Sequence, residues 1–285
     1  MQLWLQVIFY SLLITGIFYL VNPQTFSLKG TIKSFFPVTT KLSWYISAYF
    51  GLYMLIPILN TAIQHISKKT FDIMLLGLFI FSSILSSFLL QDPLVLNAGY
   101  STLWLCILYI TGAYIHKYKV TARIRKRTAF GLFFLMVLIT FLWKMAFTLL
   151  GFDTYKNVLI SYTSPTMILS GIFLFIAFSK LEFAPRFQKL IRTFAPATLG
   201  VLIIHMHPLV WEYLMKGFSA TFVNYNCIVM ILLVLTSSAA IYLVCTLIDL
   251  LRIKLFQVLK IKDLCSRFEH FFMSKFDSVD DTVRN

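Results

Sequence analysis

Apolar residues fill the chain in long runs that are interrupted by short polar segments. A membrane-spanning helix needs about 20 consecutive, predominantly apolar residues. Eight runs approach or reach this length, at residues 3–21, 43–63, 71–90, 96–116, 129–150, 157–179, 197–215 and 225–250. The pattern therefore predicts an all-α fold, a polytopic membrane helix bundle of about eight transmembrane helices.

Two further segments, 180–196 and 251–275, mix basic with apolar residues at roughly helical spacing. Basic amphipathic segments of this kind lie along the headgroup plane of a membrane. We therefore expect a membrane bundle over residues 1–250, followed by a basic, amphipathic cytoplasmic tail over residues 251–285.

Composition agrees with a membrane protein. Hydrophobic residues make up 59% of the chain and charged residues 13%, whereas soluble domains carry about 25% charged residues. The formal net charge is +14, which in a soluble protein would suggest nucleic acid as a partner. Here the basic residues lie in short segments between apolar runs, so we expect the lipid bilayer, and no nucleic acid, as partner.

The distribution of Lys and Arg predicts the orientation of the chain. The loops after the second, fourth and sixth runs, together with the C-terminus, hold 19 of them, and the remaining loops hold 5. Cytoplasmic loops carry the excess of Lys and Arg, which predicts a multi-pass plasma-membrane protein with both termini in the cytoplasm. The segment Lys117–Arg127 is the most basic loop, and phosphate binding is the alternative to a purely orienting role.

Sequence motifs for metal or phosphate chemistry are absent. The four cysteines form no CxxC pair, and the sequence contains no HExxH, no GxSxG and no Gly-rich phosphate loop. We therefore expect no metal site. The candidate chemistry is left to polar groups inside the apolar runs, where ionisable residues are costly and usually functional.

The run at 197–215 carries the densest group of such residues. His205, His207 and Glu212 are our candidate catalytic residues, and Pro208 is expected to kink the helix beside them. Positions two apart lie about 200° apart around a helix, so only a bend could turn both histidines to one site. The alternative for each histidine is a buried side chain bonded to a neighbouring helix.

Candidate substrate-binding residues lie in the run at 43–63. Tyr45, Tyr49, Tyr53 and Asn60 share one helical face, and Trp44 lies beside Tyr45 near the outer end of the run. Tyrosines offer a stacking surface together with a hydroxyl, so this face could bind a polyol. A seam between two helices and, for the first two residues, anchoring at the membrane interface are the alternatives.

Two further positions are candidates for substrate binding. Lys144 is the one cation inside an apolar run, where it could pair with a substrate hydroxyl, carboxylate or phosphate, or could extend to the headgroups. Ser164 belongs to the hydroxyl-rich segment Ser161–Pro165. Such residues either bind a ligand or tighten helix packing.

Three segments in order along the chain resemble the acyltransferase-3 family. The first is Phe36-Pro37 with Trp44–Tyr49, Leu52-Tyr53 and Ile56–Asn60; the second is Ser161–Pro165; the third is Leu199–Leu209. The family comprises polytopic bacterial membrane O-acyltransferases. The resemblance implies transfer of an acetyl group from acetyl-CoA to a hydroxyl of a cell-surface polysaccharide or its precursor, with no bound cofactor.

The first apolar run departs from the family's pattern. The family typically has about ten spans, and an Arg-x-x-x-His element in the first of them supplies its catalytic histidine. The run at 3–21 contains no His, Arg or Lys, so no residue corresponds to that histidine. We therefore expect that two N-terminal helices of the family are missing. An inactive, truncated or accessory relative and a glycan transporter component are the alternative functions.

Overall fold

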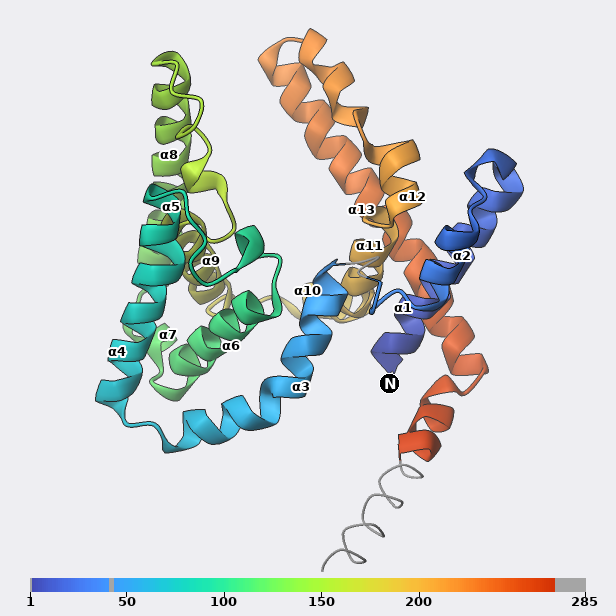
Figure 1. The fold of residues 1–285 in the computed structure, drawn as a ribbon, viewed down its shortest axis with the longest axis horizontal. Helices are drawn as coiled ribbons and strands as arrows, with labels where there is room; N and C mark the ends of the chain where they lie inside the picture. The colour runs from blue at the N-terminus through green and yellow to red at the C-terminus, as the bar shows by residue number, and fades with distance from the viewer. Residues whose placement is uncertain (1, 41–43, 270–285) are drawn as a thin grey trace, which may run out of the picture. The chain divides into compact units, whose positions relative to one another are not determined.

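The structure is a computed structural model that describes residues 2–40 and 44–269 (Figure 1). This part of the chain is almost entirely helical and contains no strand. Seven of its helical stretches are long and apolar enough to cross a membrane: Gln2–Val21, Trp44–His65, Lys68–Phe88, Lys126–Leu149, Val158–Phe178, Pro185–His205 and Cys227–Val258. The predicted class, an all-α membrane protein, is confirmed.

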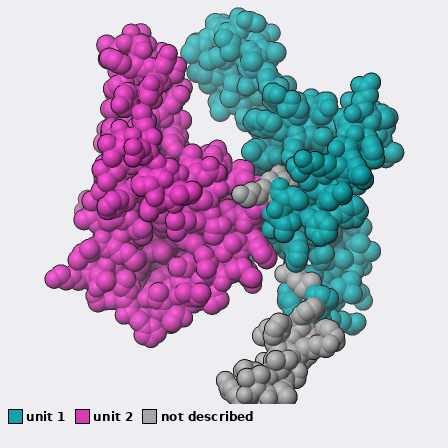
Figure 2. Space-filling model, viewed as in Figure 1, with its two compact units in different colours: residues 1–43, 184–285 teal, residues 44–183 magenta. Residues whose placement is uncertain are grey.

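The chain divides into two compact units, which Figure 2 distinguishes by colour. Unit 1 combines residues 1–43 with 184–285, and unit 2 comprises residues 44–183. The helix Cys227–Val258 passes residue 250 without a break, and the division into a bundle over residues 1–250 and a tail over 251–285 stays a prediction. The predicted tail therefore begins within a helix, and its last part, 270–285, lies outside the described residues.

Unit 1 is built on three helices that contact one another, α1, α11 and α13 (Figure 1). Helix α1 buries Val7, Tyr10 and Ile14, and α11 contributes Val201 and Ile204. The labelled α-helices of this unit are α1 (Gln2–Val21), α2 (Leu28–Phe35), α10 (Pro185–Phe194), α11 (Thr198–His205), α12 (Pro208–Val210) and α13 (Cys227–Val258), and residues 261–269 are also helical. Its shorter turns are the 3-10 helices Pro23–Thr25, Ala195–Ala197 and Phe218–Asn224 and the π-helix Trp211–Met215.

The apolar run predicted as one helix over 197–215 is broken. Helix α11 ends at His205, and His207 has an extended backbone with φ −61° and ψ 133° before Pro208 starts α12. Proline disfavours a helical conformation in the residue before it and provides no backbone N–H, so the predicted kink becomes a complete break. The stretch in this region that is long enough to cross a membrane is Pro185–His205. It includes most of the segment 180–196, which we expected to lie along the headgroup plane.

Unit 2 contains two closely packed helix pairs. Helices α8 and α9 meet through Ala129, Ile176 and Ala177, all fully buried, and small residues at such a seam let backbones approach closely. Helix α3 lies against α6 where Gly51 faces Thr102. The helices of this unit are α3 (Trp44–His65), α4 (Lys68–Phe79), the π-helix Ile80–Leu85, α5 (Ser86–Phe88), the 3-10 turn Asn97–Gly99, α6 (Thr102–Lys117), α7 (Val120–Arg123), α8 (Lys126–Leu149), the 3-10 turn Val158–Ile160 and α9 (Pro165–Phe178).

The apolar run at 96–116 explains why the described part has seven spanning stretches where the sequence predicted eight. Its helix, α6, starts at Thr102 and has 16 residues. At 1.5 Å per residue it is about 24 Å long, shorter than a hydrocarbon core of about 30 Å. The residues before it form a loop in which Val95, Asn97 and Ala98 have positive φ.

Large apolar side chains cover the outside of both units. Leu20, Leu149 and Val258 are 84%, 80% and 79% exposed. Water would oppose this exposure on so many helices, whereas lipid tails solvate it. The bilayer is therefore the solvent that the helix surfaces require.

The contact of α11 with α13 leads to a stability prediction. A Cβ atom added at Gly200 would overlap the side chain of Asp249, whereas one added at Gly16 meets no described heavy atom within 4 Å apart from the neighbouring backbone of its own helix. We expect Gly200→Ala to destabilise the protein by about 1–3 kcal/mol through overpacking. Gly16→Ala is the matched control and should be neutral or stabilising, because Ala favours a helix over Gly by up to about 1 kcal/mol. Thermal unfolding in lipid nanodiscs measures both, and equal midpoints for the two variants would contradict this packing.

Candidate functional site

A fully buried carboxylate lies at the centre of unit 1. The side chain of Asp249 in α13 has no exposed surface. Its Oδ1 accepts hydrogen bonds from Tyr10 OH at 2.7 Å and from Gln6 Nε2 at 3.2 Å, both on α1. Arg252, one turn further along α13, donates from Nε to Oδ1 at 2.7 Å and from Nη2 to Oδ2 at 3.0 Å. Four donors thus surround one buried negative charge.

The spacing of these residues explains how the cluster forms. Gln6 and Tyr10 are four residues apart and therefore share one face of α1, and Asp249 and Arg252 are neighbours on α13. Gly200 of α11 packs directly against the carboxylate, where any larger residue would collide with it. A buried carboxylate is tolerated only with a paired charge and satisfied hydrogen bonds, and these residues supply both.

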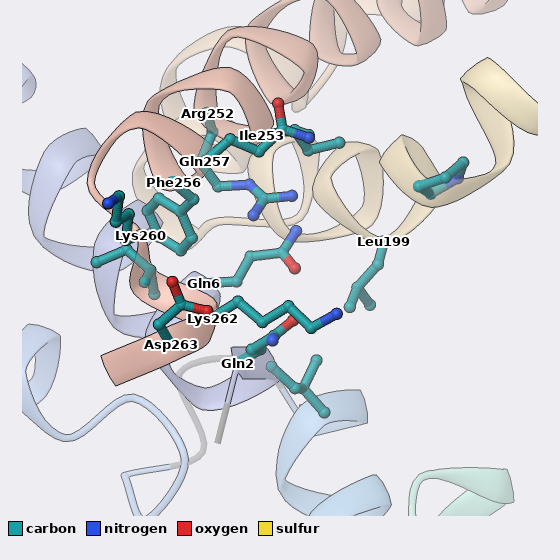
Figure 3. A pocket seen from close by; sticks show the side chains of 13 residues that line it. Gln2, Gln6, Leu199, Arg252, Ile253, Phe256, Gln257, Lys260, Lys262 and Asp263 are labelled. Carbon is teal, nitrogen blue, oxygen red and sulfur yellow. The ribbon is translucent and has the colours of Figure 1, made fainter. Parts of the chain in front are cut away.

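A cavity of about 590 Å³ adjoins this cluster within unit 1 (Figure 3). Gln6 and Arg252 belong both to the cluster and to the wall of the cavity. Lys260 and Lys262 add two further cations, against one acidic residue, Asp263. Apolar side chains, Leu199 and Phe256 among them, form another part of the wall. The cavity therefore suits an anionic ligand that also carries an apolar portion.

The histidines near this region differ in the role of each ring nitrogen. His205 Nδ1 lies 2.6 Å from the carbonyl oxygen of Val201, one turn back on α11. A carbonyl oxygen can only accept a hydrogen bond, so Nδ1 carries the proton of the neutral ring. The Nε2 atom of His205 is then the unprotonated nitrogen and is able to accept a proton.

His207 has the opposite arrangement. Its Nδ1 accepts a hydrogen bond from the backbone N–H of Leu209 at 3.3 Å and so caps the start of α12. The proton of the neutral ring is therefore on Nε2, which is buried and has no hydrogen-bond partner among the described residues. His207 thus offers a donor where His205 offers an acceptor. Glu212, the third predicted catalytic residue, is exposed and forms an ion pair with Lys216 at 2.7 Å.

The predicted substrate-binding residues of α3 have different environments. Trp44 and Tyr45 line a largely apolar cavity of about 500 Å³ in unit 2, and Tyr49 stacks on Tyr45 with ring centroids 6.2 Å apart. Tyr53 is 62% exposed. Asn60 accepts a hydrogen bond from Tyr109 OH of α6 at 2.7 Å, the bond expected of a helix seam.

Lys144 and Ser164 lie apart from those residues. Lys144 borders a separate cavity of about 220 Å³ in unit 2. Ser164 is fully buried, and its Oγ donates to the carbonyl oxygen of Leu159 at 2.9 Å, which holds the turn before α9. The structure therefore does not gather the seven predicted substrate-binding residues into one site, and their role in binding stays a prediction.

The cluster around Asp249 was missed in the sequence, although a signal was present. Asp249 is the only charged residue between Cys227 and Leu251, and Arg252 follows it at helical spacing. An ionisable residue in so long an apolar helix marks a functional position by default. What the sequence does not show is its partner, because Gln6 and Tyr10 lie more than 230 residues away.

Comparison with known families places this geometry in context. The sequence profile of the acyltransferase-3 family, described as an acyltransferase domain, matches residues 1–250. The chain belongs to the acyltransferase-3 family. The match spans both compact units of this acyltransferase-3 protein and confirms the resemblance seen in its motifs. Among curated proteins and among solved structures there is no significant match. The family and the apolar helices together support a membrane acyltransferase.

Loss of Arg252 tests how the buried charge is stabilised in this acyltransferase-3 protein. Arg252→Leu leaves Asp249 without its cation, and removal of one partner from a buried ion pair costs about 3–5 kcal/mol. Addition of Asp249→Asn removes the charge, so the double variant should recover most of the lost stability. Thermal unfolding of the two variants in nanodiscs measures the difference. A double variant no more stable than Arg252→Leu alone would contradict the assigned role.

Proposed function

We propose that this protein transfers an acetyl group from acetyl-CoA to a hydroxyl of a cell-surface polysaccharide or its precursor. The observation that carries the proposal is the basic cavity of unit 1, which lies beside the helix that ends at His205. Membership of the acyltransferase-3 family supports the reaction class.

The cavity has the chemistry expected of a site for this donor. Acetyl-CoA combines several phosphate charges with a long, weakly polar arm that ends in the thioester. Arg252, Lys260 and Lys262 supply cations for phosphates, and Leu199 and Phe256 supply an apolar wall. Leu199 precedes His205 by six residues of α11, about 9 Å along the helix. An extended arm could cover that distance while its phosphates stay among the cations.

The two histidines suggest how the transfer step proceeds. In this proposal Nε2 of His205 takes the proton from the acceptor hydroxyl, whose oxygen then attacks the thioester carbonyl carbon. The carbon–sulfur bond breaks, an ester forms, and the protonated His205 returns the proton to the leaving thiolate. His207 acts as a positioning residue in this proposal, because its Nδ1 caps α12 directly after the helix break while its Nε2–H is buried. Glu212 has no part in this step, since it is paired with Lys216.

We also propose that the donor cavity faces the cytoplasm, with both chain termini on that side of the plasma membrane. Gln2 near the start of the chain and Lys262 beyond the end of α13 line the same cavity. Acetyl-CoA is a cytoplasmic metabolite, and the basic C-terminal segment favours the cytoplasmic side as well.

A charge reversal in the cavity tests donor binding. Lys262→Glu should weaken binding of CoA about tenfold or more, because it replaces attraction of the phosphates by repulsion. Lys254→Glu is the matched control, since Lys254 is exposed on α13 and does not line the cavity. Titration calorimetry of the nanodisc-embedded protein with CoA gives both affinities. Equal weakening by the two substitutions would indicate a general charge effect and would count against this donor site.

Substitution of the histidines tests the proposed step. His205→Asn preserves an N–H group for Val201 but removes the base, so transfer of labelled acetyl groups should fall about 100-fold or more. His207→Gln retains an N–H donor and should reduce transfer by about tenfold or less. The assay follows [14C]acetyl-CoA and the cell-envelope polysaccharide of the source organism. Normal transfer by His205→Asn would exclude His205 as the base, and no transfer by the wild type despite CoA binding would favour an inactive relative.

A further inference from the structure

Unit 2 contains a small polar cavity that the proposed reaction does not use. Its volume is about 320 Å³, within the range of about 300–1,000 Å³ typical of small-molecule sites. The segment from Ser86 to Ala98 forms one wall, and the segment from Thr154 to Thr163 forms the other. The 3-10 turn Val158–Ile160 in the second wall contacts α5 in the first, so the two walls are held together.

One buried hydroxyl in this cavity lacks a partner. Ser87 of α5 is 8% exposed and lines the cavity, and its Oγ makes no hydrogen bond to any described residue. Buried hydroxyls are nearly always hydrogen-bonded, and an exception calls for an explanation such as a missing ligand. Ser87 borders an open polar space, although its Oγ itself is buried. Rotation about the Cα–Cβ bond to another staggered rotamer would turn the hydroxyl toward that space, where a ligand would supply the missing bond.

The rest of the wall is built from groups held in place. The carboxylate of Asp92 accepts hydrogen bonds from the backbone N–H groups of Leu96 at 2.7 Å and Asn97 at 2.6 Å. On the other wall the hydroxyl oxygens of Ser161 and Thr163 are 3.0 Å apart, within hydrogen-bond distance. These bonds fix the shape of the cavity before any ligand arrives, which lowers the entropic cost of binding.

The lining residues determine which class of ligand fits. None of the described residues that line this cavity is Lys or Arg. Seven of them carry a side-chain hydroxyl or amide: Ser86, Ser87, Gln91, Thr154, Asn157, Ser161 and Thr163. A phosphate or carboxylate ligand would lack a cation here. The single acidic residue, Asp92, already accepts from two backbone donors, which makes it a poor partner for a free metal ion. Hydroxyls and amides both donate and accept, which matches the hydroxyl groups of a neutral sugar.

The position of the cavity along the helices agrees with a neutral sugar as its ligand. The helical stretch Lys68–Phe88 begins with Lys68 and Lys69 and reaches the cavity at Ser87. Ser87 follows Lys68 by 19 residue steps, which correspond to about 28 Å along a helix, close to the thickness of a hydrocarbon core. Since basic residues mark the cytoplasmic side, the cavity belongs to the opposite side, where a surface glycan is found.

We infer that this cavity binds a neutral sugar unit of the acceptor, through Ser87 and the hydroxyl and amide groups around it. The inference rests on the proposed function, because it supplies a docking site for the acceptor in that reaction. It assigns a role to unit 2, whereas the donor cavity and both histidines lie in unit 1.

The test measures binding of simple sugars to the full chain in nanodiscs. Methyl glycosides of glucose, galactose and N-acetylglucosamine serve as probes in saturation-transfer NMR. At least one glycoside should bind the wild type. Ser87→Ala and Asn157→Ala should each lower the affinity for that glycoside about three- to tenfold, because each removes one hydrogen bond. Ser82→Ala is the matched control with unchanged affinity, because Ser82 lies on the same helical stretch but bonds to Leu78 and lines a different cavity.

The outcomes separate this inference from the proposed function. Failure of all three glycosides to bind, or equal binding by the wild type, Ser87→Ala and Asn157→Ala, would overturn the sugar site. The same variants are assayed for transfer from [14C]acetyl-CoA. Glycoside binding that depends on Ser87 in a protein without any acetyl transfer would refute the proposed reaction and leave the sugar site standing.

Discussion

The burial of one carboxylate constrains the whole of unit 1. Asp249 lies in an apolar helix and is inaccessible to solvent, so its charge must be balanced by donors from the protein itself. Arg252 provides the opposite charge, and Gln6 and Tyr10 bring α1 into register with α13. Gly200 leaves the space for α11 beside them. Three helices from distant parts of the chain are therefore positioned by a single electrostatic requirement.

That requirement also connects the interior to the donor cavity. Arg252 pairs with the buried carboxylate and at the same time lines the cavity, so its guanidinium is held by Asp249 rather than left to move freely. A cation fixed in this way binds an anionic group with less loss of side-chain entropy than a flexible lysine does. The ion pair thus serves packing and, in the proposed function, donor recognition together.

The break at Pro208 gives two neighbouring histidines different chemistry. His205 is the last residue of α11 and bonds back to Val201, whereas His207 stands outside the helix and caps the next one. The resulting tautomers differ, because one Nδ1 donates and the other accepts. A continuous helix would have placed the two rings on different faces with no such distinction. The proline therefore decides which histidine is suited to act as a base.

Several features of the candidate site could be read from the sequence, and others could not. The polar group around His205 and a disturbance of the helix at Pro208 follow from local composition and from the covalent structure of proline, although the sequence predicted a kink where the structure has a complete break. The hydrogen-bond partners of Asn60 and Ser164 could not be read from the sequence, because packing selects them. Asn60 accepts from Tyr109, and Ser164 donates to the carbonyl oxygen of Leu159. The short helix α6 was also hidden, because the run at 96–116 is apolar throughout while its first residues form a loop.

By itself the sequence determined that this is a helical membrane protein and an acyltransferase-3 relative. Both conclusions depend on local properties: the length of apolar runs relative to the bilayer, and the order of short motifs. Only the tertiary structure decided that Gln6, Tyr10, Asp249 and Arg252 form one cluster beside a basic cavity, and that Ser87 lines a polar one. Those contacts join residues far apart in the chain, and their register is set by helix packing, which hydropathy does not encode.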